Sequence, residues 1–361
     1  MVDASLYHLF YLVIVTILSL ISCRKYFTDS LYGQQNGVKS IIVVLFFAFF
    51  IGFRPISGKY FGDTSGYAYG YGLKEGHPFK FNIDTTNILF DNYFSWIASN
   101  QLGVTFFFVS MALMYFVFAF VAIRRLFPHD FYVVFLLFLG AFSTYAYGVN
   151  GLKAGVAASI FILALSFRDR LSVCIPLILV SYGFHHSMML PACAFAITLF
   201  FNKKPKLFFI LWLASLACSL LHVSFFQTFF AGITDEGGAN YLLNDTMENM
   251  IEMHGFRLDF VLYSSAPVLF NYYAIFKKKV EMSKMYLTLV NVYVICNSIW
   301  MLCMFASYTN RIAYLSWQLY PFVLVYPILN CNWGENRNQT FSKVMLLHLG
   351  FTLCMFVVNS F

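Results

Sequence analysis

The sequence has few charged residues. Only 11% of its 361 residues are Asp, Glu, Lys or Arg, whereas soluble domains contain roughly 25%. Hydrophobic residues make up 60% of the chain and aromatic residues 20%. No polar stretch is long enough to build a core of its own. These shortages exclude a soluble globular protein and predict a single integral membrane domain over residues 1–361.

Signatures of metal, nucleotide and disulfide chemistry are also missing. No C-x-x-C pair occurs, and the eight cysteines lie mostly inside apolar runs, which is typical of small buried residues. The patterns H-E-x-x-H, G-x-S-x-G and the P-loop are absent as well. We therefore expect no metal and no cofactor. The net charge of +7 arises from short basic clusters, so it does not predict nucleic-acid binding.

Twelve apolar runs have the length of a membrane span or slightly less. They cover residues 6–22, 40–53, 104–123, 131–147, 152–167, 171–184, 187–201, 207–226, 259–276, 285–307, 311–329 and 343–361. Basic residues follow the first run instead of preceding it, which favours a retained helix over a signal peptide. The expected fold is an all-α polytopic transmembrane helix bundle with about 12 spans.

The linkers between these runs alternate in charge. Every second linker is basic, and together these linkers hold 16 of the 23 basic residues. They contain Arg24, Lys25, Lys39, Arg124, Arg125, Arg168, Arg170, Lys203, Lys204, Lys206, Lys277, Lys278, Lys279, Lys284, Arg337 and Lys343. By the positive-inside rule these linkers are cytoplasmic, which places both termini outside.

The two long polar loops, residues 54–103 and 227–258, then lie on the outer face. Both are rich in Gly, Asn, Asp, Thr and Tyr, and loops of this size are usually functional. Apolar residues at near-helical spacing predict an amphipathic interfacial helix over residues 83–98, and a second one over residues 249–254.

Seven basic residues lie on the outer face, against the topology rule. They are Arg54, Lys59, Lys74, Lys80, Lys153, Arg257 and Arg311. Arg54, Lys153 and Arg311 lie at the mouths of predicted spans, at the depth of a lipid-linked diphosphate. Arg offers phosphate a planar fork and Lys a point charge. The alternative is that these side chains snorkel to ordinary anionic lipid.

A helical hairpin over residues 148–190 brings candidate residues to one membrane surface. If both of its apolar runs cross, Lys153 returns to the same face as His185 and His186, while the basic elbow at residues 168–170 lies on the other face. Small residues recur every four positions at Gly151, Gly155 and Ser159. This pattern lets membrane helices approach closely.

Two residues are candidates for a general base. Asp63 lies in the glycine-flanked segment FGDTSG, although this segment is also strong turn chemistry. His185 is the second candidate, or else an interfacial imidazole bonded to a backbone carbonyl. Sugar rings stack well on aromatic side chains, and the outer loops offer Tyr67, Tyr69, Tyr71, Trp96 and Tyr241; each of these also suits an interfacial anchor.

Four short segments resemble motifs of the EpsG family of Wzy-like bacterial polysaccharide polymerases. RPISGKYFGDTSGYAYGY (54–71) resembles the "R…GtDt..Y" stretch after the second helix of that family. GVNGLKAGVAASIFILAL (148–165) is similar to the "R-q-x-i-A" helix start, and FHHSMML (184–190) to the "f-H-x-s-a" element. NRIAYLSWQLYPFVLVYPIL (310–329) resembles the late "R-i-x-x-Y" helix. One departure is Lys153, where the family usually has Arg, so bidentate phosphate recognition is lost there.

The resemblance implies a GT-C-like glycosyltransferase of the bacterial inner membrane, with its site facing outward. Such enzymes join oligosaccharide repeat units carried on undecaprenyl diphosphate to make O-antigen, capsule or exopolysaccharide. The implied partners are the lipid-linked donor and acceptor and membrane lipid, with a chain-length regulator and a flippase as further candidates.

In this interpretation the substrate-binding residues are Arg54, Lys153, Arg311, Arg257, Tyr67 and Tyr71, and the catalytic residues are Asp63 and His185. Adjacent helical residues point roughly 100° apart, so we expect only His185 to face Lys153. Two other functions remain open. A flippase of lipid-linked oligosaccharide needs charges at both membrane depths, and a membrane O-acyltransferase uses an intramembrane histidine as its base.

Overall fold

The computed structural model describes residues 3–28, 37–223, 225–231, 256–306 and 309–358. Every regular element in these ranges is a helix and none is a strand, which confirms the all-α prediction. The chain divides into two compact units, Met1–Met189 with Ile328–Phe361, and Leu190–Pro327. The predicted helix at 249–254 and the predicted sugar contact Tyr241 lie outside the described residues.

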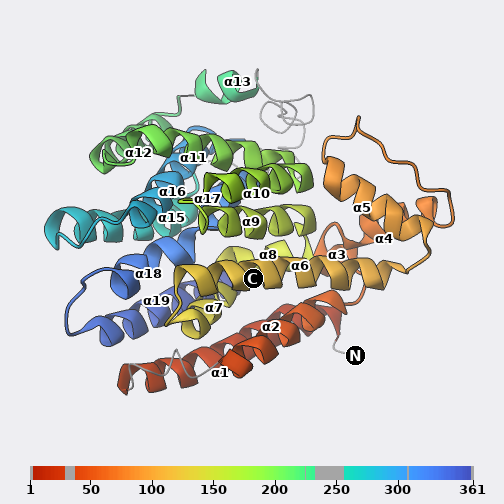
Figure 1. Cartoon of the computed structure of the whole chain (residues 1–361), viewed down its shortest axis with the longest axis horizontal. Helices are drawn as coiled ribbons and strands as arrows, with labels where there is room; N and C mark the ends of the chain where they lie inside the picture. The colour runs from red at the N-terminus through yellow and green to blue at the C-terminus, as the bar shows by residue number, and fades with distance from the viewer. Residues whose placement is uncertain (1–2, 29–36, 224, 232–255, 307–308, 359–361) are drawn as a thin grey trace. The chain divides into compact units, whose positions relative to one another are not determined.

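The first unit holds most of the segments that carry candidate residues. Its helices are α1 (Tyr7–Thr28), α2 (Gly37–Gly52), α3 (Gly58–Phe61), α4 (Thr64–Lys74), α5 (Ile88–Ser99), α6 (Val104–Leu126), α7 (Phe131–Leu139), α8 (Phe142–Val149), α9 (Leu152–Leu165), α10 (Leu171–Phe184) and α19 (Arg337–Val358) (Figure 1). Short 3₁₀ turns lie at Ala4–Leu6 and His186–Met188.

The second unit is built from the following helices. They are α11 (Met189–Phe201), α12 (Pro205–Leu220), α13 (Phe225–Ala231), α15 (Leu258–Tyr272), α16 (Lys284–Leu302), α17 (Thr309–Trp317) and α18 (Tyr320–Asn330). A π-helical turn, Tyr273–Lys277, continues α15. Polar side chains join these helices in the interior: Trp212 Nε1 donates to Asn297 Oδ1 at 2.8 Å, and Trp317 Nε1 donates to Ser264 Oγ at 2.7 Å.

The helices are apolar enough for a membrane-embedded protein. Among the described residues, five helices or continuous helix pairs are long and apolar enough to cross a bilayer. A sixth span results if α7 and α8 count as one, although they are bent by 72°. The remaining apolar helices have 10–17 residues and are short for a span. Each of the twelve predicted runs contains helix, while the number of crossings stays a prediction.

The hairpin predicted over residues 148–190 is present as α9 and α10. Their bounds agree with the predicted runs to within two residues. Ser181 Oγ on α10 donates to the Ala157 carbonyl on α9 at 2.6 Å. A Cβ on Gly155 would lie 2.9 Å from the Tyr147 carbonyl oxygen of α8. Gly155 therefore allows α9 to pack closely against α8.

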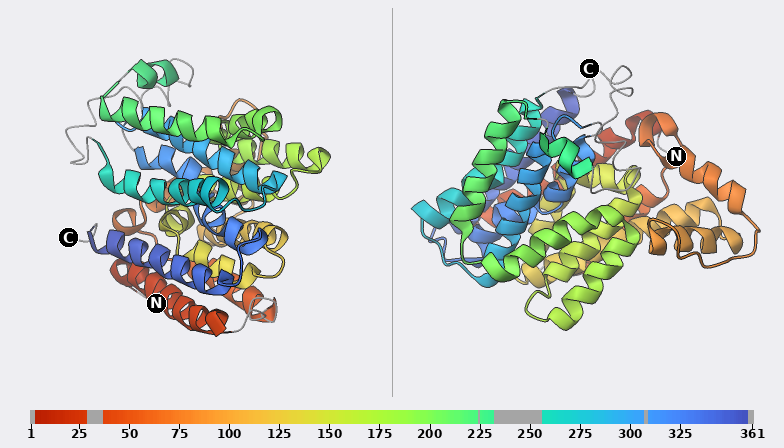
Figure 2. Two further views of the ribbon diagram at one scale, coloured as in Figure 1. Left: turned by 90° about the vertical axis from the view of Figure 1, so that its left-hand side faces the viewer. Right: turned by 90° about the horizontal axis from the view of Figure 1, so that it is seen from above.

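One end of the first unit gathers the linkers predicted to be cytoplasmic. Arg125 Nε at the end of α6 donates to Ser166 Oγ after α9 at 3.1 Å. Asp130 before α7 accepts the Tyr26 hydroxyl of α1 at 2.6 Å and pairs with Arg337 of α19. These bonds fasten α1 to α19, which lie side by side in Figure 2. Linkers assigned to one face by charge thus meet in space.

The other end of α6 carries the outer segment, residues 54–103. It is more helical than predicted, because α3 and α4 fold within it, and the predicted amphipathic helix begins at Ile88 as α5. Helix α5 packs against α4 and α10. The contact with α10 depends on Gly183, where a Cβ would lie 2.7 Å from Leu89 Cγ.

Candidate functional site

Two of the motif segments are hydrogen-bonded to each other in the first unit. The carbonyl oxygen of Val149, at the end of α8, accepts Arg54 Nη2 at 3.0 Å and Thr64 Oγ1 at 3.3 Å. The next residue, Asn150, accepts the backbone N–H of Asp63 on its Oδ1 at 2.9 Å. The segment RPISGKYFGDT is therefore fixed to the turn that starts α9. We call this arrangement the 54–150 junction.

Arg54 lies at the centre of the 54–150 junction. Its side chain is 4% exposed, its Nη1 donates to the Ile51 carbonyl at 2.9 Å, and its guanidinium carbon lies 4.5 Å from the centre of the Phe108 ring. Nε has no hydrogen-bond partner among the described residues. Burial lowers the pKa of Arg54 to about 10, so the residue stays charged at pH 7. Arg54 fixes the backbone at the ends of α2 and α8 through the Ile51 and Val149 carbonyls, and it places a positive charge in the 54–150 junction.

Asp63 is presented at the surface by a strained turn. It is exposed and precedes α4, yet its carboxylate does not cap that helix. Gly62 has φ +52°, and a Cβ there would lie 2.3 Å from Asn150 Oδ1. Only glycine fits this position. The glycine that precedes Asp63 in the motif therefore has a physical reason, and the carboxylate remains available to a ligand.

Lys153 lies in the first turn of α9, three residues after Asn150. The side chain is half-buried, and its Nζ lies 5.8 Å from the centre of the Phe90 ring of α5. The N-terminus of a helix carries partial positive charge, so a lysine there adds to that charge. A positive helix end with an added cation favours an anionic ligand.

His185 and His186 lie beside one another after α10. The two rings are nearly parallel, with centroids 5.2 Å apart and an interplanar angle of 12°. The expectation that the side chains diverge by roughly 100° is wrong, because it assumed helical backbone. The helix has already ended, and His185 has extended φ and ψ of −153° and 117°. Both imidazoles are half-buried.

The first turn of α5 links the lysine to the histidines. Asn87, just before α5, accepts the backbone N–H of His186 on its Oδ1 at 3.0 Å and lies 3.2 Å from His186 Nδ1. One turn later, the Phe90 ring lies next to Lys153 and 5.8 Å from the ring of Tyr67. Three sequence-predicted segments thus meet at α5. The sequence did not identify Asn87, Phe90 or Asn150 as site residues.

The two predicted sugar-binding tyrosines are occupied with packing. The ring of Tyr67 contacts Phe90, Phe94 and Phe107. Tyr71 is 5% exposed, and its hydroxyl accepts the backbone N–H of Gly103 at 2.8 Å. Tyr67 packs α4 against α5 and α6, and Tyr71 connects α4 to the start of α6. The other two predicted stacking residues of this segment, Trp96 and Tyr69, are exposed, with 43% and 72% of their surface accessible.

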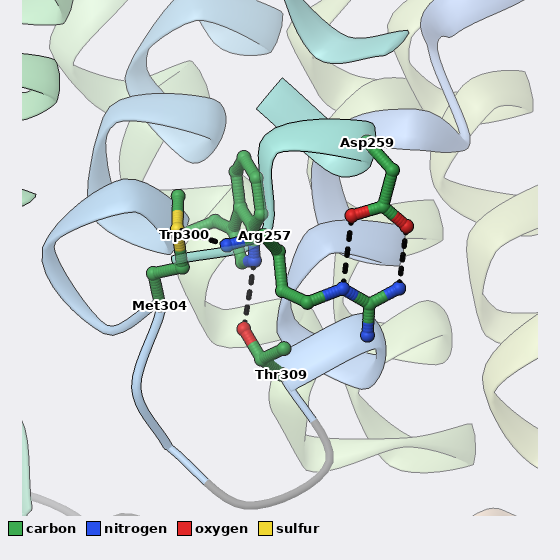
Figure 3. Close-up of polar contacts among 5 residues, drawn as sticks. All are labelled: Arg257, Asp259, Trp300, Met304 and Thr309. Carbon is green, nitrogen blue, oxygen red and sulfur yellow. Dashed lines mark hydrogen bonds and ion pairs between the residues drawn. The ribbon is translucent and has the colours of Figure 1, made fainter. Parts of the chain in front are cut away.

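Arg257 belongs to the second unit and forms a short-range ion pair. Its Nε and Nη2 donate to the two oxygens of Asp259 at 2.9 and 2.6 Å (Figure 3). The guanidinium carbon lies 3.7 Å from the centre of the Phe260 ring. The backbone N–H of Arg257 lies 3.3 Å from Met304 Sδ, beside the Trp300–Thr309 hydrogen bond. The planar face and the remaining Nη1 of Arg257 are therefore held in a fixed orientation.

Arg311 also belongs to the second unit. It is exposed in the first turn of α17. The predicted cations thus form two groups: Arg54 and Lys153 in the first unit, and Arg257 and Arg311 in the second. In the described part of the chain, no three His, Cys, Asp or Glu side chains form a metal-binding cluster.

Comparison with known proteins gives one match. The model of the EpsG family matches residues 38–361, which is most of the chain. No curated protein and no solved structure matches.

Proposed function

Because the chain belongs to the EpsG family, a family of membrane proteins of polysaccharide biosynthesis, we propose that it is a polysaccharide polymerase. In this proposal it joins oligosaccharide repeat units carried on undecaprenyl diphosphate, at the outer face of the inner membrane. The fold proposed for it is a GT-C-like bundle of about twelve spans with both termini outside. A chain-length regulator and a flippase are the proposed protein partners.

The observation that carries the proposal is the 54–150 junction. It unites the Arg54–Asp63 segment with the turn that positions Lys153, and α5 adds the histidine pair. Cations, a carboxylate and imidazoles thus gather at one end of one unit. A transfer reaction from a diphosphate carrier needs these groups, because a negative charge develops on the leaving group and a proton must leave the attacking hydroxyl.

The proposed reaction is a direct glycosyl transfer. A hydroxyl oxygen of the acceptor sugar forms a bond to the anomeric carbon of the donor glycan. The bond from that carbon to the diphosphate oxygen breaks, and the carrier leaves as lipid diphosphate with the electron pair. The hydroxyl proton passes to a base, for which Asp63 and the histidine pair are the candidates. Lys153, supported by Arg54, neutralises the leaving diphosphate, while Arg257 and Arg311 bind phosphate in the second unit.

The test is the length of the glycan in a strain that lacks the gene. We expect surface polysaccharide to fall to a single repeat unit, and the wild-type gene to restore the ladder. Complete loss of surface glycan would instead indicate a flippase. A ladder of normal length that has lost acetyl groups would indicate an O-acyltransferase. Purified protein should extend a synthetic lipid-linked repeat unit without any second enzyme.

A further inference from the structure

Helices α7 and α8 follow α1 from one of its ends to the other. Asp130, just before α7, accepts the hydroxyl of Tyr26, near the C-terminal end of α1. The carbonyl of Leu139, the last residue of α7, accepts the hydroxyl of Tyr11, near the N-terminal end of α1, at 2.7 Å. These two tyrosines are about 22 Å apart along the helix at 1.5 Å per residue. Helix α7 therefore leads away from the Asp130 network.

Helix α8 stays at the N-terminal end of α1. The Tyr145 ring of α8 stacks on His8 of α1, with centroids 4.0 Å apart and an interplanar angle of 4°. The hydroxyl of Tyr7 donates to the Phe50 carbonyl near the end of α2, shortly before the 54–150 junction at which α8 ends. The α7–α8 pair thus runs along α1 instead of turning back, as a broken span does and a re-entrant loop does not.

The usual causes of a sharp helix kink do not explain the break between α7 and α8. No proline lies between residues 131 and 149. Gly140 has φ −78°, which any residue adopts, and the nearest atom to an added Cβ would be Leu349 Cδ1 at an ordinary 3.5 Å. The chain leaves the helix at Ala141, where φ is −74° and ψ is 138°. The bend must therefore be determined by contacts that the break makes with its surroundings.

Side-chain hydroxyls bond three successive carbonyls at the break. The donors and their acceptors are Thr144 and Phe138 at 2.6 Å, Tyr11 and Leu139 at 2.7 Å, and Thr352 and Gly140 at 2.8 Å. Tyr11 comes from α1 and Thr352 from α19, so two neighbouring helices hold the break from outside. In a continuous helix Gly140 would bond the N–H of Thr144, but that N–H donates to the Ala141 carbonyl at 3.0 Å.

These hydroxyls stabilise the bent form over a straight one. All residues of α7 are buried, and a carbonyl without a partner is costly in a protein or lipid interior. If Tyr11 or Thr352 lost its hydroxyl, the carbonyl that it bonds could regain a partner only from the N–H four residues ahead. That bond requires the helix to continue through Ala141, which reduces the bend.

The bend decides where the end of α8 lies. The two helices meet at 72°, and α8 ends at Val149 and Asn150, the two acceptors of the 54–150 junction. Helix α8 has eight residues, a length of about 12 Å, so a change of roughly 10° in the bend would move its far end by about 2 Å. A hydrogen bond of 2.9 Å, such as that from Asp63 to Asn150, does not survive such a shift.

We propose that Tyr11 and Thr352 are positioning residues for the 54–150 junction. Their hydroxyls fix the bend between α7 and α8, and the bend keeps the Asn150 amide within reach of the Asp63 backbone. Neither hydroxyl contacts the substrate; both act through α8 on the turn that presents the Asp63 carboxylate. The effect on chain growth rests on the proposed function, whereas the effect on the junction does not depend on any reaction.

Hydrogen exchange at the Asp63 amide tests the bend without turnover. This N–H donates to Asn150 Oδ1 and belongs to an exposed residue, so its exchange rate measures whether α8 is in place. Thr352→Val and Tyr11→Phe each remove a hydroxyl and keep the shape of the side chain. We expect the amide to exchange roughly tenfold faster in both, the effect of losing one hydrogen bond. Thr352→Ser, which keeps the hydroxyl, should exchange like the wild type.

Thr16→Val and Gly140→Ala are the matched controls. Thr16 lies on α1 like Tyr11, but its buried hydroxyl has no hydrogen-bond partner among the described residues, so its loss should leave the exchange rate unchanged. Gly140→Ala changes the break itself and should also exchange like the wild type. Wild-type exchange in both Thr352→Val and Tyr11→Phe would overturn the proposal. Fast exchange in Gly140→Ala would overturn it as well, because the glycine would then set the bend.

Chain growth from a synthetic lipid-linked repeat unit tests the consequence for the site. A misplacement of about 1 Å far from the chemistry can cost roughly 10²-fold in rate. We expect kcat of Thr352→Val and Tyr11→Phe to fall roughly 10- to 100-fold with KM changed less than about threefold, and Thr352→Ser to restore kcat. A melting temperature shows that each variant is folded.

Two results in this assay would count against the positioning role. Slower growth without faster exchange at Asp63 would mean that the hydroxyls support the fold in general. Normal growth despite faster exchange would mean that the junction does not control the reaction. If the wild-type protein extends no substrate, the proposed function fails, while the exchange rates still decide whether Tyr11 and Thr352 hold the bend.

Discussion

The backbone N–H of Asp63 donates to Asn150 Oδ1 at 2.9 Å, across 87 residues of sequence. This bond joins the turn that presents the carboxylate to the turn that starts α9. The same Asn150 side chain would also clash with a Cβ on Gly62. The position of Asp63 relative to Lys153 therefore depends on the half-buried amide of Asn150 and on Gly62.

Gly62→Ala should disrupt the site. Alanine at φ +52° costs about 1–2 kcal/mol, and its Cβ would collide with Asn150 Oδ1. We expect loss of long-chain product and a lower melting temperature of the detergent-solubilised protein. Gly72→Ala is the matched control, because Gly72 lies within α4 with no atom within 4 Å of an added Cβ. Alanine there should stabilise the helix by about 0.5–1 kcal/mol. Equal polymer from Gly62→Ala and Gly72→Ala would contradict the role of the turn.

Lys153→Ala should abolish long-chain product at normal protein level. A cation that stabilises the leaving diphosphate is expected to contribute a factor of about 10²–10³. Lys153→Arg should keep activity, because the charge stays and the family usually has arginine there. The control is Lys80→Ala, an exposed lysine of the same outer segment. A gel ladder of surface polysaccharide measures all three, and full-length polymer from Lys153→Ala would rule out the leaving-group role.

Arg311→Ala should also abolish polymer, whereas Arg257→Ala combines two effects. Arg257 is paired with Asp259, so its removal leaves a carboxylate without its partner and should lower stability as well as activity. Asp259→Asn separates the effects, because it frees the guanidinium and keeps the arginine. We expect Asp259→Asn to retain more chain growth than Arg257→Ala. If both Arg311→Ala and Arg257→Ala made full-length polymer, these two arginines would not be needed to bind phosphate.

Gly183→Ala should weaken activity through the position of α5. Its Cβ would lie 2.7 Å from Leu89 Cγ, so α5 must move and take Asn87 away from His186. The double variant Gly183→Ala with Leu89→Ala removes the clash and should recover most of the chain growth. Gly66→Ala is the control, since nothing lies within 4 Å of its added Cβ. Failure of the double variant to recover, with folding intact, would show that the α5–α10 distance is unimportant.

The Asp130 network should matter for stability alone. Asp130 is 3% exposed, accepts the Tyr26 hydroxyl and pairs with Arg337, at the end of the unit away from the 54–150 junction. Asp130→Ala leaves the half-buried Arg337 without its carboxylate and the buried Tyr26 hydroxyl without its acceptor, and each of these hydrogen bonds to a charged group contributes about 1.5–3 kcal/mol. Tyr26→Phe should cost less, about 1–3 kcal/mol. The melting temperature measures both, and chain growth per folded molecule should stay constant.

Local pattern predicted the helices well because each was determined by its own sequence. The apolar runs of the hairpin gave α9 and α10 almost to the residue, and the charge pattern grouped linkers that do meet, such as those of Arg125 and Ser166. The break between α7 and α8 was missed. The run over 131–147 is apolar throughout, and nothing in its hydropathy marks a 72° bend.

The site was only partly predictable because its decisive bonds span long distances in the sequence. Asp63, Lys153 and the histidines carried chemical signals, whereas Asn87 and Asn150 are ordinary loop residues until the fold brings them to His186 and Asp63. The histidine rings were misjudged for a local reason. The end of α10 at Phe184 changes the backbone at His185, and a helical wheel cannot represent that change.

The hydrogen bond from Arg54 to Val149 can form only late in the synthesis of the chain. Its two residues are separated by 95 positions, and ribosomes add about 5–20 residues per second. The guanidinium therefore waits roughly 5–19 s after its own synthesis before its carbonyl partner exists. During this interval the nascent chain needs another acceptor for a charged group at the end of α2, such as a lipid headgroup or a chaperone of membrane insertion.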